Sequence, residues 1–239
     1  MHTSFLLPLL IASISTFIAI YLLRPFAISI NLVDIPNARK LHAGSVPLIG
    51  GIAMFFGVVV SILVLPYDLN DFNYFLLASL ILIIIGVLDD HRNISVSLRL
   101  LFQVLVSIII VSAAGLSITS FGSLFGNGEI FLNEWSYFIT VIAIITGINA
   151  VNMADGIHGL AGGNSLITFL AMLLLSIDNI SNQNFWIILL FCSVLPVFLI
   201  HNLCIGLPES KRIFMGDAGS MFVGMSIVWL LIDLSQGES

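Results

Sequence analysis

Residues 72–92 read FNYFLLASLILIIIGVLDDHR, an apolar run that ends in two adjacent aspartates. The apolar part, 72–88, is close to the roughly 20 residues that a helix needs to cross a bilayer. A carboxylate beside a bilayer is unfavourable, so Asp89 and Asp90 at the end of such a run indicate a functional site. Adjacent carboxylates also repel each other, and a nearby cation, either Arg92 or a bound metal, would relieve that repulsion. The alternative is that the charged pair only marks where the span ends.

Composition extends this interpretation to the whole chain. It is 59% hydrophobic and 8% charged, with a mean hydropathy of +1.15, a balance that is typical of membrane proteins and not of soluble domains. We expect an all-α polytopic membrane protein that forms one integral-membrane domain over residues 1–239. Cys192 and Cys204 are expected to be packed thiols and not a disulfide. The apolar runs predicted to be membrane-spanning helices are 5–23, 46–66, 72–88, 99–115, 135–152, 160–176, 185–205 and 218–234.

The connectors between these runs alternate in charge. All basic residues lie in or beside connectors that follow odd-numbered runs: Arg24, Arg39, Lys40, Arg92, Arg99, Lys211 and Arg212. The positive-inside rule therefore predicts that these connectors are cytoplasmic and that the N-terminus is outside. The same assignment puts Asp89, Asp90, Asp155 and Asp217 on the cytoplasmic face. On the outer face, Gly-Asn-Gly at 126–128 predicts a small β-hairpin near 121–131.

A second motif, NAVNMADGIHGLAGG at 149–163, combines polar residues with glycines. Asn149, Asn152 and Asp155 are spaced by three, which places them on one face of a helix. The glycines allow the backbone to turn and to approach a ligand closely. The alternative is a glycine-capped helix end that packs against its neighbours. That alternative explains the glycines but not the asparagines.

Three further polar groups could belong to the same site. In KRIFMGDAGS (211–220), Asp217 precedes the last apolar run, where it could instead be a helix cap, and a helix N-terminus there would favour anions. In RKLHAGSVPLIGG (39–51), Lys40 and His42 could bind phosphate or only satisfy the charge rule. His201 and Asn202 could line a cytoplasmic cavity or could bond between helices.

The chemistry that suits these residues is phosphate chemistry assisted by a metal. Carboxylates repel phosphates, and oxygen ligands of this kind select Mg²⁺ or Mn²⁺. The chain lacks the G-x-x-x-x-G-K-[ST] loop of nucleotide-binding P-loop proteins. A site at a membrane face can bring a soluble phosphorylated donor to a lipid acceptor, so we predict phosphoryl transfer between the two.

Taken together, GVLDDHRNIS, NAVNMADGIHGLAGG and KRIFMGDAGS resemble the polyprenyl-phosphate N-acetylhexosamine-1-phosphate transferases. The resemblance extends over essentially the whole chain. It implies transfer of an N-acetylhexosamine-1-phosphate, with N-acetylglucosamine the expected sugar, from a UDP-sugar to undecaprenyl phosphate. UMP would be released, and the product would start cell-envelope polysaccharide synthesis at the bacterial inner membrane. The partners are then these two substrates and membrane lipid; no nucleic acid is expected, and a homo-oligomer is left open.

The resemblance also implies roles for individual residues. Asp217 would be a ligand of Mg²⁺ (or Mn²⁺), while Asp89 and Asp90 would orient or deprotonate the lipid phosphate or help to hold the metal. Asp155 would help to position the nucleotide and the pyrophosphate. The residues expected to contact substrate are Lys40, His42, Asn149, Asn152, His158 and Asn202.

Two departures from the family pattern stand out. The chain has Asp155-Gly156-Ile157-His158-Gly159 where relatives mostly have Asp-Gly-Ile-Asp-Gly. It also ends at Ser239, whereas the family continues with further spans and a cytoplasmic histidine-rich loop. We therefore expect residues 1–239 alone to insert in the membrane but to show little or no transferase activity. The alternative function is a truncated, non-catalytic membrane remnant or a scaffold that binds a lipid phosphate.

Overall fold

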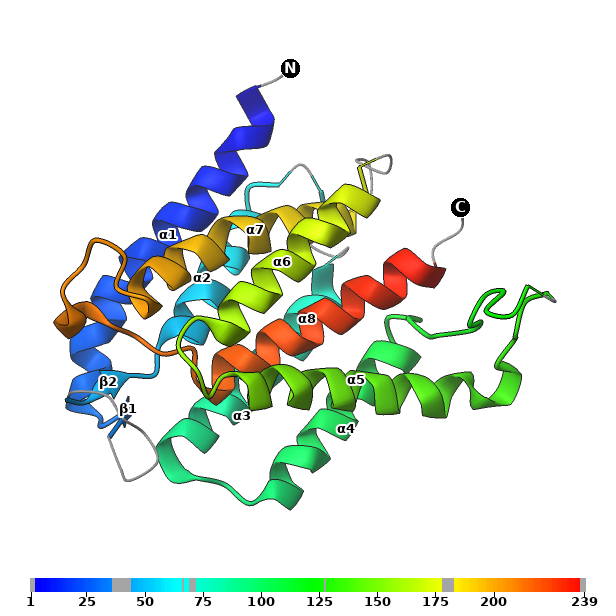
Figure 1. The fold of residues 1–239 in the computed structure, drawn as a ribbon, viewed down its shortest axis with the longest axis horizontal. Helices are drawn as coiled ribbons and strands as arrows, with labels where there is room; N and C mark the ends of the chain where they lie inside the picture. Colours follow the sequence, from blue (N-terminus) through cyan, green and yellow to red (C-terminus); the bar gives the residue numbers. More distant parts are fainter. Residues whose placement is uncertain are drawn as a thin grey trace.

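The computed structural model describes residues 3–35, 44–65, 67–68, 72–126, 128–177 and 183–236 (Figure 1). Within these residues each of the eight predicted runs overlaps one α-helix. The helices are α1 (Thr3–Ser29), α2 (Gly50–Ile62), α3 (Asn73–Arg92), α4 (Val96–Ser112), α5 (Ser136–Ala154), α6 (Leu160–Leu175), α7 (Gln183–Asn202) and α8 (Gly216–Gln236). Short 3₁₀ helices, η2 (Asn133–Trp135) and η3 (Glu209–Lys211), precede α5 and α8.

The helices differ in whether they are long enough to cross a bilayer. Five of the described helices, α1, α3, α5, α7 and α8, meet the requirement by length and apolar composition. The other three, α2, α4 and α6, are apolar but shorter. The prediction of an all-α polytopic membrane protein is thus confirmed, with spans of unequal length. Cys192 and Cys204 are both free, as predicted.

The departure from the predicted spans that bears most on the site is at the start of α2, although α1 departs further, because it ends at Ser29 and not at residue 23. The sequence predicted a span from residue 46, but Val46–Pro47 (β2) pairs antiparallel with Val33–Asp34 (β1). Leu48 then forms a parallel bridge with Phe214, just before α8. The helix therefore begins only at Gly50, whose N–H donates to the Phe214 carbonyl at 2.9 Å. This pairing fixes the connection between α1 and α2 to the segment that leads into α8.

At the opposite end of the molecule the predicted outer hairpin is present in a minimal form. Ser120 and Phe131 form one antiparallel bridge, and the Phe121 N–H donates to the Ile130 carbonyl at 3.0 Å. Figure 1 shows this segment projecting beyond the C-terminal end of α8, far from β1 and β2.

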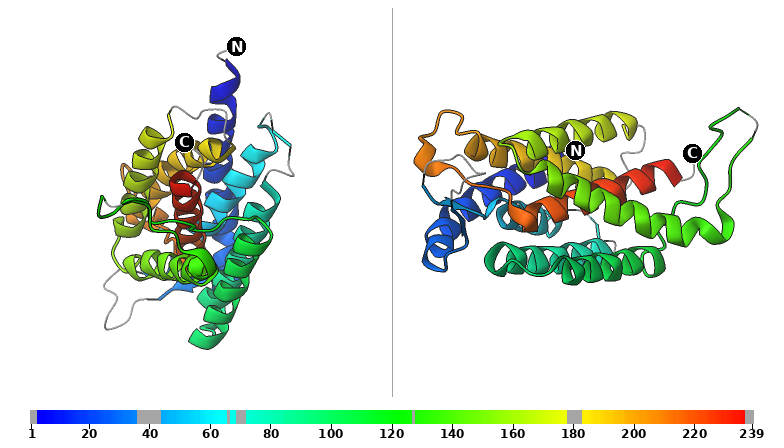
Figure 2. Two further views of the ribbon diagram at one scale, coloured as in Figure 1. Left: turned by 90° about the vertical axis from the view of Figure 1, so that its right-hand side faces the viewer. Right: turned by 60° about the horizontal axis from the view of Figure 1, so that its bottom comes forward.

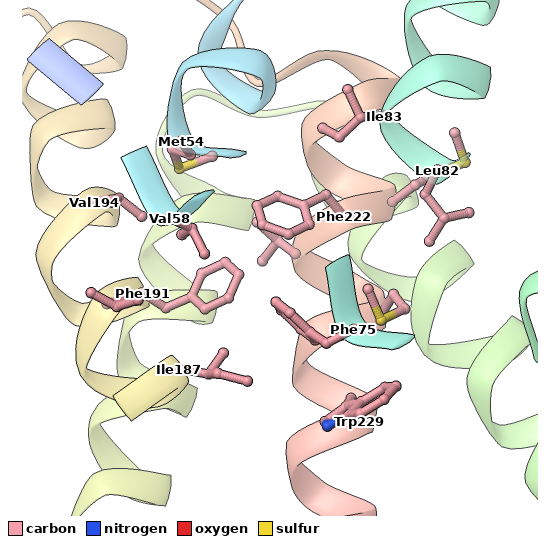
Figure 3. Packing of buried hydrophobic residues seen from close by; sticks show 14 of the residues in the cluster. Met54, Val58, Phe75, Leu82, Ile83, Ile187, Phe191, Val194, Phe222 and Trp229 are labelled. Atoms are coloured by element: carbon pink, nitrogen blue, oxygen red, sulfur yellow. The ribbon is translucent and has the colours of Figure 1, made fainter. Parts of the chain in front are cut away.

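The α8 helix runs through the middle of the bundle and is surrounded by other helices (Figure 2, left). Its Phe222 is fully buried and lies edge-on to Phe55 at 5.5 Å between ring centroids, and 5.1 Å from Phe191. Figure 3 shows Phe222 and Phe191 among the aliphatic side chains of α2 and α7, with Trp229 further along α8 and Phe75 of α3 beside it. A side chain in this position is packed on all sides, so α8 has little freedom to move.

Glycines bring the N-terminal turn of α8 into direct backbone contact with two helices. A Cβ atom on Gly51 of α2 would lie 2.1 Å from the Cα of Gly219, and one on Gly86 of α3 would lie 2.2 Å from the Cα of Ala218. In a bilayer, helices associate through such close packing because lipid is as apolar as their side chains. These contacts hold the start of α8 next to the end of α3, where Asp89 and Asp90 are.

Candidate functional site

A cleft of about 800 Å³ opens at one end of the bundle. This is the end where β1 and β2 lie, as Figure 1 shows. The walls of the cleft come from the β1 strand, Leu48 just before α2, the C-terminal ends of α3, α5 and α7, and the N-terminal end of α8. All four motif aspartates line it, together with three of the polar residues expected to contact substrate. The polar lining residues are Asp34, Asp89, Asp90, Asn93, Asn152, Asp155, His158, Asn202 and Asp217.

Asp90 is bound to the first turn of α8. Its Oδ1 accepts a hydrogen bond from the Asp217 N–H at 2.8 Å, and its Oδ2 accepts one from the Ala218 N–H at 3.2 Å. The carboxylate therefore caps α8 from outside the helix and faces its positive end. Gly216 is needed for this contact, because its φ is +74° and a Cβ there would lie 2.6 Å from Asp90 Oδ2.

Asp89 and Asp217 share one guanidinium group. Arg99 Nη1 lies 2.8 Å from Asp89 Oδ2 and 3.9 Å from Asp217 Oδ2. The Asp89 side chain is only 7% exposed, whereas that of Asp217 is 33% exposed. Asp217 is thus the more accessible carboxylate of the two, and its contact with Arg99 is the looser one.

Asn152 orients Asp217 from the other side. Its Nδ2 donates to Asp217 Oδ1 at 2.5 Å and also lies 2.9 Å from Ser220 Oγ. The predicted proximity of the NAVNMADG and GDAGS motifs is therefore a direct contact in the structure. The Asp217 carboxylate is held between an amide and a guanidinium.

Asn202 orders the loops beneath the cleft. Its Oδ1 accepts from the Gly159 N–H at 2.7 Å, and its Nδ2 donates to the Ile213 carbonyl at 2.9 Å. The side chain is 3% exposed, and these bonds use both ends of its amide. Asn202 thus lines the cleft, one of the two alternatives that the sequence left open, and also bonds to the segments that precede α6 and α8. His201 is also buried, with Nδ1 2.9 Å from the Val197 carbonyl, and does not line the cleft.

The other predicted residues differ in where they lie. His158 is exposed at the cleft and packs against the Phe214 ring with 5.0 Å between centroids, and Asp155 is half-buried in the lining. Asn149 is not a lining residue, because its Nδ2 points to α4 and donates to Gln103 Oε1 at 2.7 Å. Lys40 and His42 fall outside the described residues.

Three polar residues of this region were not predicted: Arg99, Asp34 and Asn93, which follows α3 in the cleft lining. Arg99 was counted only for the charge rule, yet it is the sole charged residue in the apolar helix α4, which is a signal that could have found it. Asp34 lines the cleft from β1. It lies in a connector predicted to be on the same face as the motif aspartates, but no motif surrounds it.

The carboxylates of the cleft can be examined as possible ligands of a metal ion. Among the described residues no group of three or more His, Cys, Asp or Glu side chains is arranged to hold a metal ion. The available ligands are nevertheless of the right kind for Mg²⁺, since Asp89 and Asp217 are hard oxygen donors on either side of one cation, Arg99. The residues therefore fit a hard divalent cation in chemical type.

Comparison with known proteins shows which family has these motifs. The sequence profile described as glycosyl transferase family 4 matches residues 72–235, from the start of α3 to the end of α8. The matched region contains all four motif aspartates, Arg99 and Asn152.

Curated relatives agree with this match. The undecaprenyl-phosphate alpha-N-acetylglucosaminyl 1-phosphate transferase of Salmonella typhi is 37% identical over 225 residues, which cover 94% of this chain and 61% of the relative. The proteins of the same name from Yersinia pestis and Haemophilus influenzae are 38% and 37% identical, covering 92% and 98% of this chain and 60% and 66% of the relatives. The chain thus spans about three fifths to two thirds of the length of these relatives. It belongs to glycosyl transferase family 4.

Proposed function

We propose that the protein transfers N-acetylglucosamine-1-phosphate from UDP-N-acetylglucosamine to undecaprenyl phosphate and releases UMP. The observation that carries the proposal is the convergence of Asp89, Asp90 and Asp217 at the N-terminus of α8, in an open cleft at one end of a membrane bundle. The names of the relatives, which describe such transferases, support it.

The reaction joins two anions. An oxygen of the lipid phosphate attacks the β-phosphorus of the UDP-sugar, and the bond from this phosphorus to the oxygen bridging to the α-phosphate breaks. UMP leaves with the bonding electrons, and the products are UMP and a lipid-linked diphosphate sugar. Because both reactants are negative, the cleft must supply positive charge and fixed orientation.

A divalent cation would bind to Asp217 and Asp89, and it would neutralise the phosphates and stabilise charge on the transferring group. The need for a cation comes from the carboxylate-rich lining of the cleft, which repels phosphates and cannot bind them unaided. Magnesium is the expected metal, with manganese as an alternative of the same ligand preference.

The protein's own groups have separate tasks in this proposal. Asp90, bonded to two amides of α8, keeps the helix start in place. Asp89 orients or deprotonates the lipid phosphate, and Asn152 holds the Asp217 carboxylate. Asp155 and His158 line the part of the cleft where the nucleotide and pyrophosphate are proposed to lie. Lys40 and His42 remain proposed as phosphate-neutralising residues.

We also propose that the cleft faces the cytoplasm at the bacterial inner membrane. The support is that the described basic residues Arg24, Arg92, Arg99, Lys211 and Arg212 lie at or near the ends of helices on the cleft side. Membrane-impermeant thiol labelling of intact cells tests the orientation. Ser123→Cys at the other end should react, whereas Ser210→Cys near η3 should not, and the reverse pattern would show that the orientation is inverted.

The activity is tested by following UMP release from UDP-N-acetylglucosamine in membranes that hold the 239-residue chain, polyprenyl phosphate and Mg²⁺. A parallel sample extends the chain with the C-terminal part of the Salmonella typhi relative. We expect release and a lipid-linked product that Asp217→Asn abolishes, with the extended sample the more active. Lipid-phosphate binding without UMP release in both samples would overturn the proposal in favour of a binding scaffold.

A further inference from the structure

A second layer of polar side chains lies one helical turn below the cleft. Gln103 follows Arg99 by four residues on α4, Asn149 precedes Asn152 by three on α5, and Met221 follows Asp217 by four on α8. Residues at these spacings share a helix face. The three helices that position Arg99, Asn152 and Asp217 therefore also supply the layer beneath them.

The members of this layer are bonded to one another across the helices. Asn149 Nδ2 donates to Gln103 Oε1 at 2.7 Å and to the Ile145 carbonyl of its own helix at 2.8 Å. Gln103 Nε2 donates to Met221 Sδ at 3.6 Å. Gln103 is fully buried, with Val106, Ser107 and Ile110 also fully buried on α4, so both ends of its amide are used inside the bundle.

A buried amide pair restricts helix register more than apolar contacts do. Apolar side chains accept small rotations and sliding with modest loss, whereas a short hydrogen bond in an apolar interior is broken by them and leaves unpaired groups. A single buried polar residue is known to fix register in helical assemblies at some loss of stability. The pair Gln103–Asn149 links α4 to α5, and the Met221 contact links both to α8.

We propose that Gln103 and Asn149 are positioning residues that fix the register of α4, α5 and α8, so that Arg99, Asn152 and Asp217 converge at the cleft. The effect on turnover rests on the proposed transferase function, but the effect on helix register does not. Asn149 then acts through Asn152, one turn above it, and does not contact substrate. This assignment agrees with its absence from the cleft lining.

The test replaces the amide pair with apolar side chains of similar size. The variants are Gln103→Leu, Asn149→Leu and the double variant, with the exchanged pair Gln103→Asn/Asn149→Gln as the conservative rescue. Ser107→Ala is the matched control, because the Ser107 hydroxyl is equally buried but bonds only to the Gln103 carbonyl of its own helix, at 2.7 Å. Amide hydrogen exchange of peptides 149–155 and 216–221 is measured beside kcat and KM for UDP-N-acetylglucosamine.

We expect the double leucine variant to unfold near the temperature of the unmodified protein, because removing both partners of a buried bond leaves no unpaired group. Hydrogen exchange in both peptides should nevertheless rise about tenfold, as register becomes loose. For the same reason kcat should fall about tenfold, with KM changed less than about threefold, since misplacement of reacting groups affects mainly the transition state. The exchanged pair should recover most of both losses, and Ser107→Ala should change neither.

Unchanged exchange in both peptides of the double leucine variant would overturn the proposal, and so would equal effects of Ser107→Ala. If Gln103→Leu does not fold, Asn149→Leu, which leaves the Gln103 contact to Met221 in place, gives the same comparison with the exchanged pair. Absence of UMP release from both the 239-residue chain and its extended form would reject the transferase function. The exchange data would still decide whether the amide pair fixes register.

Discussion

The two ends of the bundle use polar side chains in opposite ways. At the end away from the cleft, Gln236 Oε1 accepts from the Thr119 and Ser120 N–H groups at 2.8 and 3.1 Å, and its Nε2 donates to the Ser120 carbonyl at 3.1 Å. In this set of bonds a neutral amide meets neutral backbone groups. At the cleft end, carboxylates of Asp89 and Asp217 share one Arg99 guanidinium.

The difference shows how one architecture separates a structural end from a reactive one. A closed set of neutral bonds joins α8 to the α4–α5 connector and needs no further ligand. A surplus of carboxylates beside the membrane is stable only with additional positive charge, from a helix terminus, an arginine or a bound cation. The cleft end is thus prepared to bind something, and the opposite end is not.

The sharpest test of this contrast is the same substitution at both ends of α8. Asp217→Asn should lower turnover at least a hundredfold, or about 2.7 kcal/mol in the barrier, since it removes a charged metal ligand. Asp233→Asn, on the same helix at the far end, should leave turnover within about twofold. Both are measured by UMP release over a range of Mg²⁺ concentrations. Equal losses of turnover in the two variants would show that both substitutions act by disturbing the folding of α8 and not by removing a metal ligand.

Alanine substitutions at two glycines with positive φ, one at each end of the bundle, test how tightly the two ends are packed. Gly216→Ala combines a strained φ of +74° with a Cβ 2.6 Å from Asp90 Oδ2, so it should lower the free energy of unfolding by about 2–3 kcal/mol and displace Asp90. Gly122→Ala has a similar φ of +65° but open space around it, and should lower that free energy by only about 1 kcal/mol. Thermal unfolding in detergent measures both; a larger effect at Gly122 would contradict the packing argument.

The cleft can also be made more acidic. His158 is exposed in the lining, at the position where the family pattern implied by the sequence has aspartate, and a carboxylate there would add a hard oxygen ligand. We expect His158→Asp to lower the Mg²⁺ concentration for half-maximal turnover by about threefold, roughly 0.7 kcal/mol. The uncharged His158→Asn is the control and should not share the gain. Loss of turnover in His158→Asp alone would show that the imidazole has a role of its own.

The smallest expected effect on activity is at the structural end. Gln236→Leu removes the bonds to Thr119 and Ser120 and should lower the free energy of unfolding by about 1 kcal/mol. Turnover per folded molecule should not change, because the site lies at the other end of α8. Thermal unfolding and UMP release on the same preparation check this. A tenfold loss of turnover would mean that the two ends are coupled through α8.

Much of the fold was predictable because it depends on local properties. Each apolar run became a helix, and Gly-Asn-Gly at 126–128 was a sufficient signal for the outer pairing of Ser120 with Phe131. The late start of α2 was not predictable, because the pairing of Leu48 with Phe214 joins residues far apart in the sequence. The extent of the domain, residues 1–239, stays a prediction.

For the candidate site, the motifs were predictable and the partnerships were not. Spacing by three placed Asn149, Asn152 and Asp155 on one helix face, but only the last two line the cleft. Position along α5 determines which of these residues reach the cleft. Asn149 lies one turn further from the cleft than Asn152, and it faces Gln103 of α4. Spacing along one helix gives the face, while depth is set by how far the neighbouring helices extend.

The membrane class, the helical runs and the gathering of the aspartates at one face could be inferred from the chain alone, since they follow from apolar length and charge distribution along it. That Asp90 caps α8, that Asp89 shares Arg99 with Asp217, and that Asn149 turns away from the cleft became visible only in the folded molecule. These partnerships depend on close packing between helices. Contacts such as Gly51 against Gly219 and Gly86 against Ala218 fix the angle and depth at which helices meet, and hydrogen-bond partners follow from that geometry.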